Sequence, residues 1–248
     1  MRTPARHVPR VLAATLATLA LSALCACERP KPSQEGAQAP DAMPREALID
    51  SAPGAAPGAP DPAGERPVIV CLGDSLTAGH GVAEAESWPA LLQARLDARG
   101  YRYKVVNAGI SGDTSAGGRA RMDWLLRQRI DILIVELGAN DGLRGIDPTT
   151  TQDNLDAIIQ KGIGVGATVV LAGMQMPLNY GADFKRRYDA VFPALARRHG
   201  LPFIPFLLEG LAGRRELNLP DGIHPTGEGY TIVLETVWKT LAPLLLKP

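Results

Sequence analysis

The chain has 248 residues, with 26 Lys or Arg and 26 Asp or Glu, so its formal net charge is zero. This balance excludes the basic excess that typifies nucleic-acid-binding proteins, and we expect no nucleic-acid partner. Cysteines occur only at positions 25, 27 and 71. Cys71 lies in an apolar run, where it is expected to be a small buried hydrophobe rather than a reactive thiol or half of a disulfide.

Residues 1–27 have the pattern of an export signal. Arg2, Arg6 and Arg10 precede an uncharged, mostly apolar run from Val11 to Ala26, and small residues follow. The run is shorter than the roughly 20 residues that a membrane-spanning helix needs. An uncleaved N-terminal anchor is the alternative interpretation.

The segment Leu24-Cys25-Ala26-Cys27 resembles the lipobox of bacterial lipoproteins, in which the last cysteine is lipidated and becomes the new N-terminus. Cys25 departs from that pattern, since a small non-thiol residue usually stands there. Cleavage to a soluble periplasmic protein is therefore a second interpretation. We expect an exported, periplasmic protein that a lipidated Cys27 could attach to the membrane.

Residues 28–66 are predicted to be a disordered linker. Of these 39 positions, 21 are Ala, Pro or Gly and none is aromatic. Such a segment has too little apolar surface to offset the entropy lost on ordering. Residues 67–248 are then expected to form one domain of ordinary size, with 19 acidic and 19 basic residues.

From Pro67 onward, short β-branched runs alternate with longer stretches of helical periodicity. This alternation predicts an α/β fold, with a parallel sheet covered by helices on both faces. In such sheets the ligand lies beyond the carboxyl ends of the strands. The predicted strands are 68–72, 103–107, 131–137, 168–173 and 202–206. The apolar positions that predict helices lie within 88–96, 122–126, 155–159, 184–195 and 230–241, and the first helix should end near Arg99-Gly100.

The first motif is Gly-Asp-Ser-Leu at 73–76, directly after the first predicted strand. A serine at a strand-to-helix turn exposes its hydroxyl at the edge of the sheet, so Ser75 is a candidate nucleophile. The alternative is that Ser75 only caps a helix.

The second motif, residues 107–114, follows the second strand and contains Gly109, whose bare amide could point at a developing oxyanion. The alternative is an ordinary glycine-rich loop.

The third motif is Gly-Ala-Asn-Asp at 138–141, after the third predicted strand. The Asn140 side chain offers uncharged N–H donors suited to an oxyanion, although Asn140 or Asp141 could instead cap a helix.

The glycines at 162, 164 and 166 stand after a predicted helix and before a predicted strand. That order is wrong for a dinucleotide-binding loop and predicts a helix end and a turn.

The fourth motif is Asp-Gly-Ile-His-Pro at 221–225, before the last predicted helix. His224 has a carboxylate three residues upstream, in Asp221. That carboxylate can accept a proton from one ring nitrogen and leave the other free to accept the serine proton. The other histidines have no comparable partner. A serine, an asparagine and this pair at strand ends together predict a hydrolytic site.

Metal ligation is not predicted, because the region from 67 onward has no clustered histidines or cysteine pair. Spacing alone is compatible with paired-carboxylate glycosidase chemistry, but such chemistry would leave Asn140 and the Asp221/His224 pair unexplained.

Together the four motifs resemble the signature blocks of the SGNH hydrolases, also called GDSL lipases/esterases. The resemblance runs from about residue 67 to the C-terminus and is strongest to the bacterial branch of thioesterase I, lysophospholipase L1 and arylesterase. Longer segments that carry it are 87–92 (SWPALL), 135–138 (VELG), 140–145 (NDGLRG), 179–181 (NYG) and 221–225 (DGIHP).

The resemblance implies a role for each matching residue. Ser75 would be the nucleophile, His224 the general base and Asp221 the carboxylate that orients it. The oxyanion would be held by the Ser75 amide, the Gly109 amide and the Asn140 side chain. The family fold is a three-layer α/β/α sandwich with a flavodoxin-like parallel sheet of about five strands, and this branch needs no metal or organic cofactor.

The expected reaction is hydrolysis of carboxylic esters of the arylesterase or lysophospholipase type, on a small-molecule or lipid substrate. Acyl-CoA is a cytoplasmic metabolite, so thioesterase activity is the second interpretation for an exported enzyme. Carbohydrate O-deacetylation is a third. The non-enzymatic alternative is a surface-anchored binding module that retains only the fold.

Overall fold

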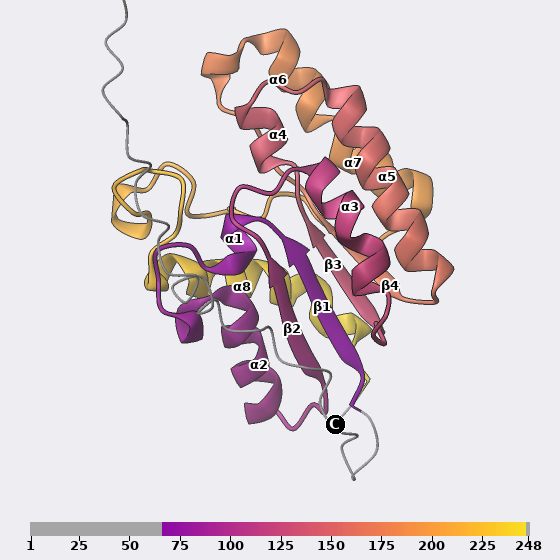
Figure 1. Ribbon diagram of the computed structural model, residues 1–248. Coiled ribbons are helices and arrows are strands. Elements are labelled where there is room, and N and C mark those ends of the chain that lie inside the picture. The colour runs from indigo at the N-terminus through magenta and orange to yellow at the C-terminus, as the bar shows by residue number, and fades with distance from the viewer. Residues whose placement is uncertain (1–65, 247–248) are drawn as a thin grey trace, which may run out of the picture. The chain divides into compact units, whose positions relative to one another are not determined.

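The computed structural model describes residues 66–246 (Figure 1). The predicted export signal, Cys27 and all of the predicted linker except Arg66 lie outside the described residues. Within 66–246, no helix combines the length and apolar character needed to cross a bilayer.

Five parallel strands form one sheet, in the order β2-β1-β3-β4-β5. In this order β1 lies between β2 and β3. At its carboxyl end Gly73 pairs with Gly109 of β2 and with Glu136 of β3, so the first three motifs meet at one edge. The strands are β1 (Val68–Gly73), β2 (Lys104–Gly109), β3 (Ile132–Glu136), β4 (Thr168–Ala172) and β5 (Phe203–Ile204).

Helices cover both faces of this sheet, and the predicted three-layer α/β/α fold is confirmed (Figure 1). Helices α2 and α8 pack together on one face, and α3, α5 and α7 on the other. The α-helices are α1 (Ser75–Ala78), α2 (Trp88–Ala98), α3 (Ser115–Leu125), α4 (Ala139–Leu143), α5 (Pro148–Gly164), α6 (Ala182–Asp189), α7 (Val191–His199) and α8 (Gly227–Leu241). Short 3₁₀ turns are η1 (Glu84–Glu86), η2 (Leu178–Tyr180), η3 (Arg215–Leu217) and η4 (Ala242–Leu244).

The core lies on both sides of β1 and β3. Ile69–Leu72 of β1 and Leu133–Val135 of β3 are fully buried, which is why their sequences are apolar at successive positions rather than alternating. Cys71 is among these buried residues, as expected. Helix α5 ends at Gly164, and Gly166 has a positive φ in the turn that follows, so the predicted helix end and turn are found here.

Two elements differ from the sequence prediction, and prolines explain both. The predicted helix over 184–195 is two helices, α6 and α7, that meet at Ala190. Pro193 has no N–H for the carbonyl of Asp189, so it is tolerated in the first turn of α7 but would break a continuous helix. Strand β5 is only two residues long, because Pro202 and Pro205 flank it and cannot donate ladder hydrogen bonds.

Candidate active site

Ser75 is the first residue of α1, directly beyond the end of β1. The residue that caps this helix is Asp74, whose Oδ1 accepts a 3.0 Å hydrogen bond from the Leu76 amide. The alternative role of Ser75 as the helix cap is therefore wrong. The Ser75 hydroxyl makes its hydrogen bond with a different residue.

That residue is His224, in the loop before α8. The His224 Nε2 lies 2.9 Å from Ser75 Oγ, and its Nδ1 lies 2.8 Å from Asp221 Oδ2. Residues 149 positions apart are thus joined in one hydrogen-bonded chain. The structure brings together the three residues that the motifs single out.

The Asp221 carboxylate also holds its own loop. Its Oδ1 accepts hydrogen bonds from the amides of Ile223 (2.8 Å) and His224 (3.0 Å). The His224 amide and ring, with the Ile223 amide, lower the pKa of Asp221 to about 2. An ionised carboxylate only accepts, so the proton of the His224 ring must sit on Nδ1. The His224 Nε2 is then the acceptor for the Ser75 hydroxyl.

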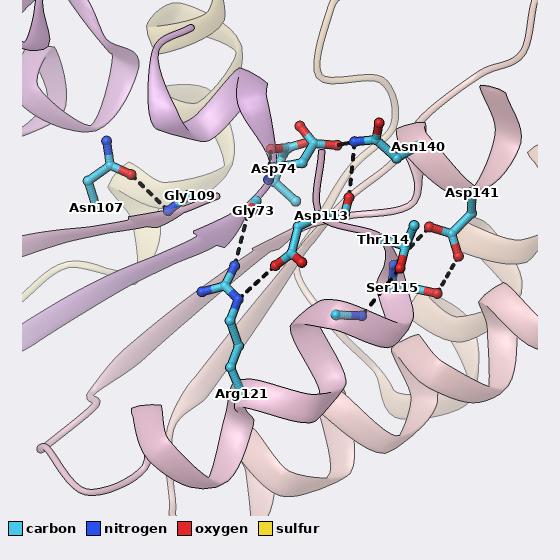
Figure 2. Close-up of polar contacts among 12 residues, drawn as sticks. Gly73, Asp74, Asn107, Gly109, Asp113, Thr114, Ser115, Arg121, Asn140 and Asp141 are labelled. Atoms are coloured by element: carbon cyan, nitrogen blue, oxygen red, sulfur yellow. Dashed lines mark hydrogen bonds and ion pairs between the residues drawn. The ribbon is translucent and has the colours of Figure 1, made fainter. Parts of the chain in front are cut away.

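Asn140 comes from the first turn of α4 and lies beside Asp74, the residue before Ser75 (Figure 2). Its Nδ2 donates to Asp74 Oδ2 (3.1 Å) and to the carbonyl of Asp113 (3.0 Å). Asn140 lines the same cavity as Ser75 and His224. The amide is therefore held by both of its hydrogens at the wall of the cavity that contains Ser75 and His224.

Gly109 does not reach this cavity. Its N–H donates to Asn107 Oδ1 at 2.9 Å (Figure 2). A Cβ at Gly109 would lie 2.2 Å from the backbone nitrogen of Ala78, so close packing of β2 against α1 explains the glycine. Gly112, three residues further on, does line the cavity with Ser75 and Asn140. The structure therefore does not support Gly109 as an oxyanion donor and points to Gly112 instead.

A second buried acid lies behind Asp74. Glu136, at the end of β3, is fully buried and accepts hydrogen bonds from Thr77 Oγ1 (2.6 Å) and the Asp74 amide (3.3 Å). Its Oε1 has no partner among the described residues. Burial raises the pKa of Glu136 well above its usual range, and burial also raises the pKa of Asp74 to about 6. Burial thus favours the protonated form of Glu136 relative to an exposed carboxyl group.

Asp141, next to Asn140, anchors the third motif to α3. It is fully buried, and its carboxylate accepts hydrogen bonds from the amide and hydroxyl of Ser115 (Figure 2). It also accepts one from Thr151 Oγ1. Asn154 Nδ2 completes the cluster by donating to Ser115 Oγ. The bonds to Asp141 tie α4 to α3 and α5, and the bond from Asn154 ties α5 to α3, so this network holds the turn that carries Asn140.

Two adjoining cavities open at the carboxyl edge of the sheet. The smaller, about 260 Å³, surrounds Ser75 and His224 and includes Gly112 and Asn140. The larger, about 480 Å³, shares four residues with the smaller: Leu76, Ala139, Leu143 and Ile223. Its further lining is mainly apolar and includes Met174, Met176, Pro177, Phe206, Leu208 and Ala212.

His80 is a residue that sequence reasoning did not place in the site. Its ring centroid lies 4.5 Å from that of His224, and it lines the smaller cavity. Its position five residues after Ser75, at the end of a one-turn helix, was the available signal. The Glu136 acid was also missed, although a charged residue closing an apolar strand indicates a buried polar partner.

Within residues 66–246, no group of three or more histidine, cysteine or acidic side chains is arranged to hold a metal ion. A serine, histidine and aspartate in one hydrogen-bonded chain, at the carboxyl edge of a parallel sheet, form the arrangement of the serine hydrolases.

Comparison with known proteins agrees with this class. The model of the GDSL-like Lipase/Acylhydrolase family matches residues 71–232. An esterase named TesA from Pseudomonas aeruginosa is 45% identical over 178 residues, which cover 71% of this chain and 89% of the relative. The Escherichia coli (strain K12) protein named thioesterase 1/protease 1/lysophospholipase L1 is 37% identical over 178 residues, with coverage of 71% and 84%. A crystal structure of TesA superposes with a TM-score of 0.70, covering 72% of this chain and 99% of that one at 45% identity.

The chain therefore belongs to the GDSL-like lipase/acylhydrolase family. The family resemblance and the ester hydrolase expected from the four motifs are both confirmed.

Proposed function

We propose that this enzyme hydrolyses carboxylic esters through an acyl-enzyme on Ser75. His224 Nε2 takes the Ser75 proton as Oγ attacks the acyl carbon, and Asp221 stabilises the resulting imidazolium. The imidazolium then protonates the leaving alcohol. Water, deprotonated by His224 in turn, releases the acid and restores Ser75.

The oxyanion is proposed to be held by the amides of Ser75 and Gly112 and by the Asn140 side chain. Donors fixed in advance at this position are commonly the largest single contribution to catalysis, and the loss of one typically costs about 10²- to 10³-fold in rate. For Asn140, the proposal requires that one N–H now bonded to Asp74 or Asp113 be shared with the oxyanion in the transition state.

The observation that carries the proposal is the pair of contacts at His224, 2.9 Å to Ser75 and 2.8 Å to Asp221, at the wall of an open cavity. A binding module would have no need of a base aligned on a serine hydroxyl. The distances match those expected between a nucleophile, its base and the carboxylate that orients the base.

The larger cavity supports a substrate with an apolar acyl chain. It opens beside the nucleophile and is lined mainly by aliphatic, methionine and phenylalanine side chains, which favour burial of hydrocarbon at about 0.8 kcal/mol per CH₂. Aryl or lysophospholipid esters are therefore the first candidate. Acyl thioesters are the second, favoured by the Escherichia coli relative whose name includes thioesterase 1.

A fluorophosphonate probe and an ester panel test this proposal. We expect the probe to label wild-type protein and Ser87→Ala but not Ser75→Ala, and Ser75→Ala to lose p-nitrophenyl ester turnover by at least about 10⁴-fold. Labelling of the Ser75→Ala protein, with near wild-type turnover, would exclude the acyl-enzyme. Palmitoyl-CoA turnover far above that of lysophospholipid and aryl esters would place thioesters first, and a preference for acetylated sugars would indicate a deacetylase.

The proposal extends to the cell envelope, where residues 1–27 would direct the chain and Cys27 could carry the lipid. The support is the sequence pattern of this segment alone. Palmitate labelling and intact mass of protein purified from membranes test it, with Cys25→Ala and Cys27→Ala as a matched pair. Labelling lost only in Cys27→Ala supports the anchor. An unmodified, freely soluble mature protein would end the anchor proposal and leave the chemistry untouched.

A further inference from the structure

Arg121 lies in the middle of α3, yet its guanidinium reaches back to the edge of the sheet (Figure 2). Its Nε donates to Asp113 Oδ2 at 2.8 Å, and its Nη2 donates to the carbonyl of Gly73 at 3.0 Å. The side chains of Arg121 and Asp113 are only 16% and 15% exposed. One mostly buried cation therefore binds two different loops of the site.

Both loops carry catalytic groups. Gly73 is two residues before Ser75, and its carbonyl also accepts the Ile110 amide of the second motif at 3.1 Å. Asp113 directly follows Gly112, the proposed oxyanion donor. The position of the Ser75 loop relative to the Gly112 loop thus depends on the two bonds that Arg121 makes.

Asp113 connects the third motif to the same cation. While its carboxylate is held by Arg121, its carbonyl accepts from Asn140 Nδ2 at 3.0 Å. The seat of the Asp113 carboxylate is also tight, since a Cβ on Gly117 would lie 2.0 Å from Asp113 Oδ1. A rigid seat for Asp113 fixes the carbonyl that orients the Asn140 amide.

We propose that Arg121 is a positioning residue that sets the geometry of the oxyanion site. It lines neither cavity, and it acts through Gly73 and Asp113 on the donors of Ser75, Gly112 and Asn140. Arginine suits this task because its planar guanidinium binds two acceptors at fixed angles, whereas a lysine offers a point charge. A misplacement of about 1 Å at a reacting centre can cost about 10²-fold in rate.

The inference rests on the proposed function, and its test separates the two. Arg121→Gln and Asp113→Asn are each expected to lower kcat by about 10- to 100-fold per active site counted by burst titration, with KM changed less than about threefold. The double variant should lose little more than the worse single variant, because both substitutions remove the same contact between Arg121 and Asp113. Arg121→Lys should recover part of kcat.

Arg95→Gln is the matched control. Arg95 pairs with Glu235 between α2 and α8, is similarly shielded at 20% exposed, and lies away from the cavities. This variant is expected to lose stability without losing kcat per site. Thermal melting of all variants separates positioning from folding, since only Arg121 and Asp113 variants should lose kcat while still folded at the assay temperature.

An alkyl boronic acid that forms an adduct with Ser75 provides a second measurement, because a hydroxyl of that adduct occupies the oxyanion site. Its affinity should fall in parallel with kcat/KM across the Arg121 and Asp113 variants. Wild-type kcat in a folded Arg121→Gln protein, or a loss confined to the fraction of titratable sites, overturns the proposal. Activity that survives in Ser75→Ala would instead overturn the proposed function itself.

Discussion

Asp221 illustrates how one side chain can fix both a loop and a tautomer. It accepts two backbone amides of its own loop and the Nδ1 proton of His224. These bonds lower its pKa to about 2, so it is ionised throughout the pH range in which an esterase is assayed. The acid limb of a pH–rate profile then reports groups other than Asp221.

Replacement of Asp221 with Asn tests this role. The amide would present N–H to the His224 ring and favour the tautomer with its proton on Nε2, which cannot accept from Ser75. We expect Asp221→Asn to lower kcat by on the order of 10³- to 10⁴-fold, with KM little changed. The measurement is steady-state turnover of a soluble ester, with circular dichroism as the control for folding. A loss below about tenfold would contradict the orienting role.

The buried carboxyl groups of Asp74 and Glu136 have pKa values shifted in the opposite direction from that of Asp221. Their raised pKa values mean that the folded protein keeps protons at a pH where the unfolded chain has lost them, near pH 4. The folded state then binds more protons, so the free energy of unfolding falls as pH rises above about 4. For Asp74 this loss is complete once the pH is well above its pKa of about 6.

Glu136→Gln should therefore flatten the pH dependence of stability. Glutamine keeps an oxygen for Thr77 and replaces the carboxyl O–H with an amide, without an ionisable group. We expect stability within about 1 kcal/mol of wild type at pH 5 and a smaller decline from pH 5 to pH 9. Urea unfolding at pH 5, 7 and 9 measures this, with exposed Glu228→Gln as control. Parallel curves for wild type and variant would show that Glu136 does not hold the proton.

At the scale of elements, Thr226 caps the N-terminus of α8 and helps to fix the position of that helix. Thr226 accepts a 3.2 Å hydrogen bond from the Gly229 amide and donates to the Leu217 carbonyl at 3.3 Å. It stands two residues after His224 and so joins the catalytic loop to a helix that packs on the sheet.

Thr226→Ala is expected to lower the free energy of unfolding by about 1 kcal/mol, the usual cost of losing a helix cap. Thr226→Ser keeps the hydroxyl and should stay near wild type. Chemical denaturation gives the stability, and kcat should remain within about threefold because Asp221 fixes His224 independently. A large loss of kcat without loss of stability would show that the cap itself holds His224.

The elements also show what the sequence can and cannot predict. Strands β1 and β3 were predictable because they are apolar on both faces. The break between α6 and α7 had a sequence signal, Pro193, that the apolar periodicity of 184–195 hid. The short length of β5 could likewise have been predicted from its flanking prolines, but a prediction based only on apolar residues does not take them into account.

The site was predictable to the level of motifs, not of every atom. Ser75 and Asn140 follow the ends of β1 and β3, and Asp221 and His224 share one motif before α8, so the fold brings these four residues together. The sequence does not show which glycine of the second motif faces the cavity, because Gly109 and Gly112 are chemically identical. Only packing against Ala78 shows that Gly109 faces α1.

At the scale of the whole molecule, the larger cavity is assembled from segments distant in the chain, from Leu76 to Ile223. Leu208 lines it without contributing to the catalytic chain. Leu208→Trp is expected to lower kcat/KM for decanoyl esters at least tenfold and to leave acetyl esters within about threefold, because lost hydrocarbon burial is proportional to chain length.

A p-nitrophenyl ester series from C2 to C12 measures this effect, with Val165→Trp, an exposed position outside both cavities, as control. Equal losses for all chain lengths would mean that the indole disturbs the catalytic groups rather than the acyl cavity. An unchanged series would place the acyl chain elsewhere.

The prolines beside β5 affect more than the length of a strand. An open sheet offers its outer strand as a template on which another chain can add by backbone hydrogen bonds. Here the edge strand β5 is two residues long, and the residues that flank it, Pro202 and Pro205, have no backbone N–H to donate. This side of the sheet is therefore closed to strand addition from a neighbouring molecule, which protects a concentrated enzyme against edge-to-edge aggregation there.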